Sequence, residues 1–533
     1  MIKIEIMKNY SSSKKIILYL FIVIGVSMNI SCNKQINNAP ISSTYGSEFW
    51  TSQTAVSQAE AAMMTQLRAS LRVSSGSGVD QNEPCFFVYG DLVSNLFRYA
   101  SGDTFLQYGL TPDGSIPWNF SYVPYWGNLL DWSRFYKVIA LANLISENVQ
   151  SMDASLFSSE KVRSQYIARA LFIRAYTYFY MTRVWGDPVY VARTYNDADY
   201  GHIEALPRSP EKDVLDSCLK DLHIAEASLD YAGGDASESL SPNKGSAEAL
   251  MAHIFAWKHD YDSTHYYCQK VITEGGYSLE PMATYTNIWQ GQKSNESIFE
   301  ISMTYNDKDP NFKGGGDYAE ANFNMFGLFL KGSIVSEQRS SCWIAPAEGL
   351  IDQELFDTSK DLRAKSILSY QQASGGDPAG YMLLKYTNFA FQSPDTKEYP
   401  YINNNLVLLR LSDMYLLDAE ALAYKGDLSG AAADLKMTED RAGINNYASI
   451  TSKDNMIDEI IKERGREFIG EGEWYYDLIR TNYTQGWLQK IGYPSTRVSA
   501  TNKGYYWPID METLFPYDNQ LVQNPYWQNN AGR

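Results

Sequence analysis

The feature that most constrains this chain is an internal repeat of a helix-forming segment. Shifted by 167 positions, AHIFAWKHDY (252–261) lies over AEALAYKGDL (419–428). Both copies carry small residues four positions apart, then a tight KHD or KGD turn and a second helical pattern. Alanines at this spacing let two antiparallel helices approach closely, as in stacked helical repeats. The repeat predicts a scaffold of helical hairpins, and chance similarity between two alanine-rich helices is the alternative. The matching pairs are Ala252 and Ala419, Ala256 and Ala423, Trp257 and Tyr424, Lys258 and Lys425, and Asp260 and Asp427.

Further helical patterns lie before the first copy. Periodicity begins in residues 49–71 and returns in WSRFYKVIALANLISENV, residues 132–149. Residues 166–187, YIARALFIRAYTYFYMTRVWGD, are apolar nearly all round, which predicts a buried helix. Acidic residues follow Pro210, and negative charge favours the N-terminus of a helix there.

Two regions between the helical patterns carry loop signals instead. Residues 85–127 are aromatic and punctuated by Gly, Asp and Pro, and residues 274–398 are rich in Gly, Asn and aromatic side chains. Long loops on a helical scaffold usually carry function. The predicted fold class is therefore mostly α, with long, loop-rich aromatic insertions and little β.

The charge of the chain limits its partners. The formal net charge is −17. Because phosphate binding needs a basic face, this charge argues against a nucleic-acid partner. The 40 Tyr and 12 Trp residues offer flat apolar surface with a polar tip, which suits stacking on a ligand, although most fill the core.

The N-terminus predicts an export signal that ends at Cys32. Two lysines precede an apolar run from Ile16 to Val26, which has the length of a signal-peptide core and is too short to span a bilayer. Ser31 is the small residue that a lipoprotein signal peptidase requires, although Asn29 stands where Leu is usual. We expect a lipoprotein anchored through Cys32. A secreted protein with an incidental cysteine is the alternative.

Cysteine and histidine spacings predict no metal site and no cofactor. No CxxC pair is present, so the remaining cysteines are expected to be buried free thiols. Three of the five histidines are spaced by six positions, whereas a helical zinc pair needs spacing by four. The four other cysteines are Cys85, Cys218, Cys268 and Cys342.

The segment ERGREFIGEGEWYYDL, residues 463–478, allows two explanations of its glutamates. Glu463, Glu467 and Glu471 follow a spacing of four, which predicts one helix face with ion pairs along and between helices. A glycosidase acid–base pair instead needs two carboxyls that converge across a cleft at about 5–9.5 Å with separated pKa values. Neighbours on one helix face do not bracket a sugar in this way, so we expect a structural role.

The order of several motifs resembles the SusD/RagB family of Bacteroidetes outer-membrane lipoproteins. These motifs are ARALFIRAYTYFYMTRVWGDPVYV, KGSAEALMAHIFAWKHDYDSTHYYCQKVI, LLRLSDMYLLDAEALAYKGDLSGAAADLKMTEDRAG, ERGREFIGEGEWYYDLIR and YYWPIDMETLFPYDNQLVQNPYW. The resemblance covers the chain from about Cys32 to its end. The ER-REF-EG-W-DL block is the most diagnostic, although GEW replaces the usual GHRW here.

The resemblance implies an α-helical protein with four tetratricopeptide-like hairpins. Such a protein sits as a lid on a SusC-like TonB-dependent transporter in the outer membrane and binds nutrient, mostly oligosaccharide, without hydrolysing it. The expected divisions are a signal peptide at 1–31, the lipidated Cys32 and a tether at 32–46, an N-terminal region at 47–230, and a C-terminal region with helical repeats and ligand-binding loops at 231–533. The expected location is the outer membrane, facing the cell exterior.

The resemblance also places the ligand site in the N-terminal loop region and in the loops between the repeats. There, aromatic rings would pack on the apolar faces of sugars, while Asp, Asn and Arg would bind hydroxyls. The candidate ligand-binding residues are Asp91, Tyr108, Trp118, Tyr318, Arg339 and Trp343. Three other tryptophans in helical motifs are assigned to packing: Trp132, Trp185 and Trp474.

Three other functions remain open from the sequence. Some members of the family bind peptides, so the cargo could be peptide. A secreted α-helical glycoside hydrolase would be revealed by an activity assay. A helical-repeat adaptor for other proteins would not need the long aromatic loops of this chain.

Overall fold

The computed structural model describes most of the chain between residues 48 and 530. The described residues are 48–72, 85–99, 118–120, 127–195, 204–232, 236–291, 294–303, 329, 343–346, 349–374, 378–393, 395–396, 398–512, 514–515, 518–528 and 530. The chain divides into two compact units, residues 1–55 and 56–533. The fold presented below is that of the second unit.

Helices make up most of the described residues. They are α3 (Gln53–Arg72), α4 (Cys85–Gly90), α6 (Gly127–Leu130), α7 (Ser133–Ser151), α8 (Glu160–Trp185), α9 (Glu211–Ser228), α10 (Ala236–Ser239), α11 (Lys244–Trp257), α12 (Tyr261–Glu274), α14 (Leu362–Ile367), α15 (Leu411–Lys425), α16 (Leu428–Ala442), α17 (Lys453–Glu467), α18 (Trp474–Gln485), α19 (Trp487–Lys490) and α20 (Pro525–Gln528). The 3₁₀-helical segments are η2 (Leu92–Ser94), η3 (Ala154–Leu156), η5 (Tyr285–Trp289) and η8 (Asn446–Ser449), and η7 (Leu350–Leu355) is a π-helical segment.

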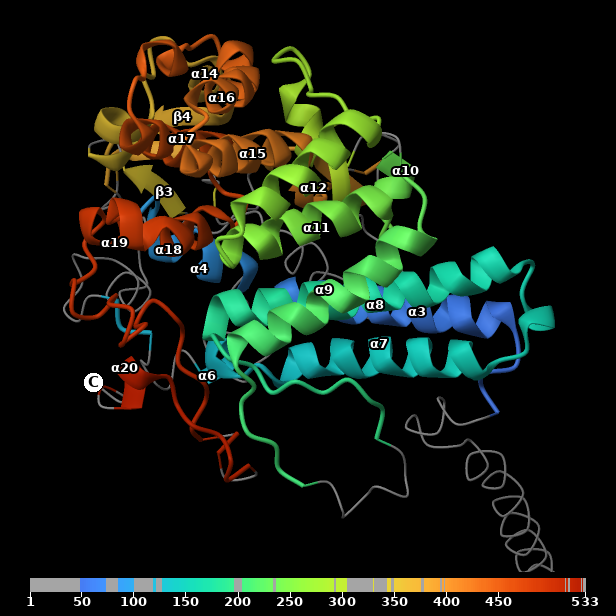
Figure 1. The fold of residues 1–533 in the computed structure, drawn as a ribbon. Coiled ribbons are helices and arrows are strands. Elements are labelled where there is room, and N and C mark those ends of the chain that lie inside the picture. Colours follow the sequence, from blue (N-terminus) through green and yellow to red (C-terminus); the bar gives the residue numbers. More distant parts are fainter. Residues whose placement is uncertain are drawn as a thin grey trace, which may run out of the picture. The chain divides into compact units, whose positions relative to one another are not determined.

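Helix α8 lies at the centre of the first helical layer, between α7 and α9 (Figure 1). Ser159 caps its first turn by accepting a hydrogen bond from the backbone N–H of Val162 at 3.2 Å. Every residue from Ala170 to Trp185 is buried. The prediction of a buried helix at 166–187 is confirmed, because an element packed on both sides needs apolar residues all round.

The two copies of the sequence repeat form two helical hairpins that pack on each other. Helices α11 and α15 begin at Lys244 and Leu411, and α12 and α16 begin at Tyr261 and Leu428, so the offset of 167 holds at both helix starts. Helix α12 of the first hairpin packs on α15 of the second. The rings of Tyr261 and Tyr424 stack there, with centroids 4.2 Å apart. The predicted scaffold of helical hairpins is confirmed.

The turn inside each hairpin has the same backbone form. Asp260 caps α12 and Asp427 caps α16, each by accepting a hydrogen bond from a backbone N–H three residues later. The residue before each cap has a left-handed conformation, with φ of 59° at His259 and 87° at Gly426. Glycine adopts this conformation without strain, whereas histidine does not.

Three small antiparallel sheets complete the described part of the unit. The first has the strand order β1-β3-β5-β4, the second pairs β2 with β8, and the third pairs β6 with β7. Strand β8 leads directly into α15, so the second sheet is attached to the second hairpin. The strands are β1 (Arg98–Tyr99), β2 (Ser297–Ile301), β3 (Trp343–Pro346), β4 (Leu368–Gln371), β5 (Gly380–Leu383), β6 (Phe389–Ser393), β7 (Glu398–Ile402) and β8 (Leu406–Arg410).

Several smaller expectations can be compared with the described residues. Cys85, Cys218 and Cys268 are buried free thiols, as predicted, whereas Cys342 lies outside the described residues. The tryptophans assigned to packing are buried: Trp132, Trp185 and Trp474. In the part of the chain that was searched, no helix is both long and apolar enough to cross a membrane. No group of three or more potential metal ligands occurs among the described side chains.

Candidate functional site

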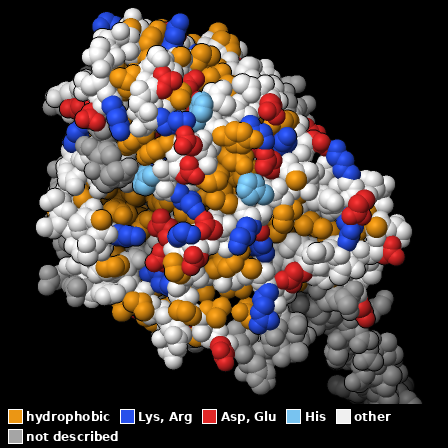
Figure 2. Space-filling view, viewed as in Figure 1, with side chains coloured by type: hydrophobic (Ala, Val, Ile, Leu, Met, Phe, Trp, Pro, Cys, Tyr) orange, Lys and Arg blue, Asp and Glu red, His pale blue; other side chains and the backbone are white. Residues whose placement is uncertain are grey.

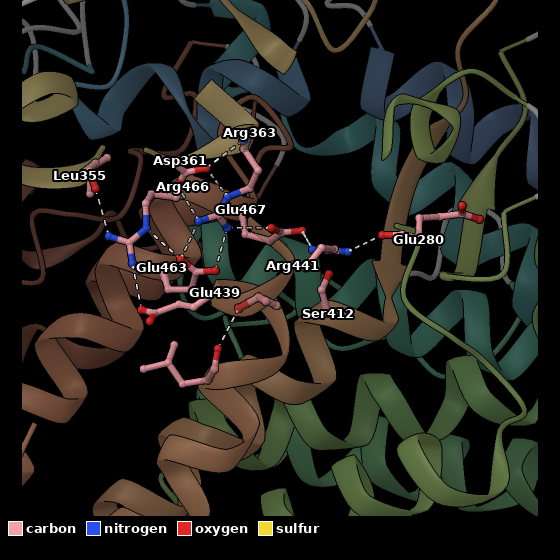
Figure 3. Close-up of polar contacts among 12 residues, drawn as sticks. Glu280, Leu355, Asp361, Arg363, Ser412, Glu439, Arg441, Glu463, Arg466 and Glu467 are labelled. Carbon is pink, nitrogen blue, oxygen red and sulfur yellow. Dashed lines mark hydrogen bonds and ion pairs between the residues drawn. The ribbon is translucent and has the colours of Figure 1, made fainter. Parts of the chain in front are cut away.

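Three of the four glutamates in residues 463–478, namely Glu463, Glu467 and Glu471, belong to a buried ion network, here called the carboxylate network; Figure 3 shows the part around Glu463 and Glu467. The fourth, Glu473, pairs with Arg183 instead. The carboxylate network joins α17 and the turn after α17 to α14, β8 and α16. Because these elements come from distant parts of the sequence, the network holds the C-terminal half of the unit together. Its anions are Glu296, Asp361, Glu439, Glu459, Glu463, Glu467 and Glu471, and its cations are Arg363, Lys385, Arg410, Arg441 and Arg466.

Glu467 lies at the centre of the carboxylate network. Its Oε1 accepts a hydrogen bond from Arg410 Nη1 at 2.6 Å, and its Oε2 accepts one from Arg363 Nη1 at 2.9 Å. Arg441 also donates to Oε1. Burial raises the pKa of Glu467, but the three guanidiniums outweigh burial and hold the pKa well below its usual range. Glu467 is therefore a permanently ionised structural group.

The prediction that Glu471 continues the same helix face is wrong. Helix α17 ends at Glu467, and Glu471 lies in the following turn, between two glycines with φ of 76° and 78°. The turn brings the Glu471 carboxylate to Arg410, which donates from Nε at 2.9 Å and from Nη2 at 2.8 Å, and to Lys385 Nζ at 2.5 Å. Burial lowers the pKa of Lys385 to about 8, against the opposing effect of Glu471. The expected ion pairs are present, but a turn rather than a helix places this carboxylate.

Glu439 and Glu463 come nearest to the pattern of an acid–base pair, because their pKa values shift in opposite directions. Burial and the charge of Glu463 raise the pKa of Glu439 to about 8. Burial also acts to raise the pKa of Glu463, but Arg363 and Arg466 lower it. Both glutamates are 0% exposed. A glycosidase pair must face a cleft that admits the sugar, and this pair faces only protein.

Asp91 is placed against the turn that follows α17. Its Oδ2 accepts a hydrogen bond from the backbone N–H of Gly472 at 2.7 Å. The preceding Gly90 is so close to this turn that an added Cβ would lie 1.9 Å from the carbonyl oxygen of Gly472. Burial raises the pKa of Asp91 well above its usual range, and the side chain is 0% exposed. In this structure Asp91 joins two distant segments and does not face solvent.

Trp118 is also buried. Its ring stacks on Tyr493 with centroids 4.2 Å apart, and its carbonyl oxygen accepts a hydrogen bond from Arg497 Nη1 at 2.5 Å. Its φ of 56° is unusual for a bulky residue, so the surrounding packing holds the backbone in place. The role of Trp118 as a ligand contact stays a prediction, and its geometry is that of a support for the loop.

The two loop regions that were predicted to share the ligand site meet in the structure. Strand β1 pairs with β3, with Tyr99 opposite Trp343. Phe329, from the second region, packs against Phe87 and Phe97 of the first, with ring centroids 5.1 and 5.2 Å apart. The remaining predicted residues Tyr108, Tyr318, Arg339 and Cys32 lie outside the described residues.

The cationic half of the carboxylate network could not be identified from the ERGREF segment. Arg363, Arg410 and Arg441 lie 26 to 104 residues away from Glu467. The sequence does hold one indication of these partners. Arg410 is the single arginine in the mostly apolar run LVLLRLSDMYLL, and a charged residue in such a run needs a buried partner of opposite charge.

Comparisons of the sequence with known proteins identify related families and proteins. Residues 352–527 match the SusD family model, and residues 121–256 match a model described as "Starch-binding associating with outer membrane". A SusD-like protein of Formosa agariphila is 24% identical over 97% of this chain and 99% of its own length. Another, from Bacteroides ovatus, is 25% identical over 70% of each chain.

Solved structures show the same fold. A SusD superfamily protein from Bacteroides thetaiotaomicron superposes with a TM-score of 0.69 at 21% identity and covers 90% of this chain and 99% of its own. A laminarin-binding SusD-like protein has a TM-score of 0.65 at 20% identity and covers 89% and 99%. Stacked helical hairpins with loop-rich insertions define the class as a tetratricopeptide-like scaffold. Within that class, the chain is a member of the SusD-like family.

Proposed function

We propose that this protein is a cell-surface lipoprotein that captures oligosaccharide and delivers it to a SusC-like TonB-dependent transporter. The observation that carries the proposal is the match of residues 121–256 and 352–527 to SusD-type models, one of them described as starch-binding. The structural similarity to a laminarin-binding relative supports a glycan as cargo.

The proposed ligand surface combines the two loop regions that meet at β1 and β3. Tyr108, Tyr318, Arg339 and Trp343 would supply stacking rings and a hydrogen-bonding guanidinium. Asp91 and Trp118 would act beneath them, because both are buried and tie the first loop region to the C-terminal half. A dissociation constant near micromolar, about −8 kcal/mol, suits a protein that must release its cargo to a transporter.

The protein is proposed to act without catalysis. The glutamates of the diagnostic ERGREF block are paired with arginines and buried, and a sugar cannot reach them in this structure. On the face shown in Figure 2, acidic, basic and hydrophobic side chains are interspersed. That mixed surface fits a ligand recognised by local contacts rather than by a field of one sign.

Calorimetry with a panel of glycans and peptides tests the cargo. We expect saturable binding of at least one oligosaccharide, about tenfold weaker in Trp343→Ala, with Trp343→Phe retaining most of the affinity because it keeps a ring. Binding of peptides alone would assign the cargo to the peptide class. Hydrolysis of the offered glycan would overturn the non-catalytic role.

Fractionation and affinity purification test the location and the partner. Cys32→Ala should move the protein from the outer-membrane fraction to the soluble fraction, because stable anchoring needs the acyl chains attached at that residue. Purification of the native protein from membranes should recover a large TonB-dependent transporter. If the transporter alone retains the Cys32→Ala protein, removal of the transporter should release it.

A further inference from the structure

A cavity of about 290 Å³ is lined by residues outside the predicted ligand set. It is formed by the start of α9, the end of α11 with the turn at His259, the end of α18 and residues 498–506. None of the predicted ligand residues is among the side chains that line it. We infer that this cavity is a second sugar site, which holds one neutral pyranose unit of the glycan. The inference rests on the proposed function for the class of ligand.

One wall of the cavity is made of fixed aromatic rings. Glu211 accepts hydrogen bonds from Trp257 Nε1 at 2.9 Å and from the Tyr506 hydroxyl at 3.0 Å, so a single carboxylate orients both rings. Tyr505 lies edge-on to Tyr506, with centroids 4.8 Å apart, and its backbone carbonyl accepts a hydrogen bond from the Tyr475 hydroxyl at 2.9 Å. Trp257 and Tyr506 are buried, so Tyr505, backed edge-on by the fixed ring of Tyr506, is the ring on which the apolar face of a sugar packs.

The other wall offers unused hydrogen-bonding groups. The amide nitrogen of Asn482 donates to the carbonyl oxygen of Val498 at 3.3 Å, but its Oδ1 is buried and has no partner among the residues that the structure describes. A buried acceptor without a donor is unfavourable, and a ligand hydroxyl would supply the donor. The Lys503 ammonium lies 6.0 Å from the Tyr506 ring centroid and forms no ion pair with any described carboxylate.

Two strained backbone positions lie at this cavity. In the described part of the chain, four residues other than glycine have a positive φ: Asn95, Trp118, His259 and Lys503. Two of them, His259 at 59° and Lys503 at 48°, line the cavity from opposite segments. Strained backbone of this kind persists where the surrounding structure fixes it and is found repeatedly at ligand sites.

The charges around the cavity favour a neutral ligand, because the Lys503 ammonium is balanced by the Glu211 carboxylate on the same lining. Arg480 forms two hydrogen bonds with Glu420, at 2.9 and 2.6 Å, and an ion pair with Asp477, so its charge is already compensated. Partial desolvation and the nearby Arg480 lower the pKa of His259, so the imidazole is neutral at neutral pH. The volume lies near the lower limit of about 300–1,000 Å³ for ligand pockets, so one sugar ring fits better than a chain.

Saturation-transfer NMR on the purified full chain, with methyl glycosides of glucose, galactose and mannose as probes, tests the site. We expect saturable binding of at least one probe with a dissociation constant of about 1–10 mM. Tyr505→Ala should weaken this binding about tenfold, because it removes the accessible ring, and Tyr505→Phe should preserve it. Tyr266→Ala, a matched change at a tyrosine that is 56% exposed and outside the cavity, should have no effect.

The outcomes separate this inference from the proposed function. Failure of all three probes to bind, equal binding by Tyr505→Ala and the wild type, or displacement of the probe by inorganic phosphate would each overturn the sugar site. Oligosaccharide titrations run in parallel report on the loop surface. Suppose that oligosaccharides fail to bind while a methyl glycoside binds in a Tyr505-dependent manner. The proposal that the loop surface captures oligosaccharide is then wrong, whereas the sugar site in the cavity is supported.

Discussion

The two hairpins of the internal repeat share a backbone but are held in place by different interactions. At the start of α11, Asn243 and Ser246 form a reciprocal capping box. At the equivalent position before α15, Arg410 instead enters the carboxylate network. The end of α16 likewise places Glu439 and Arg441 in that network, where the first hairpin has Ile272 and Glu274.

The difference continues at the contact between the two helices of each hairpin. The first hairpin has the buried side chains Met251 and Tyr267, whereas the second has Asp418 and Asp434 at the same positions. Asp418 accepts hydrogen bonds from His265 at 2.6 Å and from Gln269 at 2.7 Å, both on α12. The second hairpin packs between α12 and α17, so its side chains are those that suit contacts with these two helices. The repeat therefore specifies the backbone, while each packing partner determines the side chains.

Breaking the carboxylate network should have the largest effect. Glu467→Ala leaves three buried guanidiniums without their shared carboxylate, and the free energy of unfolding should fall by about 3–5 kcal/mol. Denaturant unfolding measures the change, and calorimetry should show ligand affinity unaltered. Lys212→Ala, which removes a largely exposed ion pair on α9, is the control and should cost about 0–1 kcal/mol. Unchanged stability with lost binding would instead assign Glu467 a functional role.

Removing the cap of the first hairpin should have a smaller effect. Asn243 accepts from the N–H of Ser246 at 3.0 Å and donates to the carbonyl oxygen of Ile298 at 2.8 Å. Asn243→Ala should lower the free energy of unfolding by about 1–2 kcal/mol. If this loss equals that of Glu467→Ala in the same unfolding assay, the contrast between the two hairpins is wrong.

The carboxyl pair of the second hairpin, Asp418 and Asp434, should make the stability of the protein depend on pH. Burial and the neighbouring Asp418 raise the pKa of Asp434 to about 8, from 3.8. The folded state therefore binds this proton more tightly than the unfolded state, and the resulting stability is lost as pH rises from about 4 through about 8. Asp434→Asn cannot ionise and should flatten this part of the stability curve. An unchanged curve would show that the pair shares no proton.

The smallest effects are expected at the hairpin turns. Gly426 has φ of 87° and nothing within 4 Å of an added Cβ, so Gly426→Ala should cost about 1 kcal/mol through backbone strain alone. His259→Gly should raise the melting temperature slightly, because relief of strain is partly offset by the entropy of glycine in the unfolded chain. Thermal unfolding of both variants measures the change in melting temperature, which should be negative for Gly426→Ala and positive for His259→Gly.

Sequence reasoning worked where structure follows from local periodicity. The repeat, the buried helix α8 and the packing of Trp185 could be predicted, because the pattern that reveals each one lies within single helical segments. Contacts between segments far apart in the sequence could not be predicted. The pairing of Tyr99 with Trp343, the burial of Trp118 beneath Tyr493 and the arginine partners of Glu467 depend on segments brought together by the whole fold. The spacing of four also predicted helix as far as Glu471, which is wrong. Helix α17 ends at Glu467, and Gly470 and Gly472 in the next segment have positive φ, which a helix does not allow.

The tie between Asp91 and Gly472 has a consequence for how the chain folds. These residues are 381 positions apart. Gly90 fits against Gly472 only because Gly90 carries no side chain, and a Cβ on Gly472 would clash with the ring of Phe86. The first aromatic segment can reach its native environment only after nearly the whole chain has been synthesised. Contacts of such sequence separation form late and slow the folding reaction. The N-terminal part therefore cannot complete its packing until the segment around Gly472, in the last fifth of the chain, is in place.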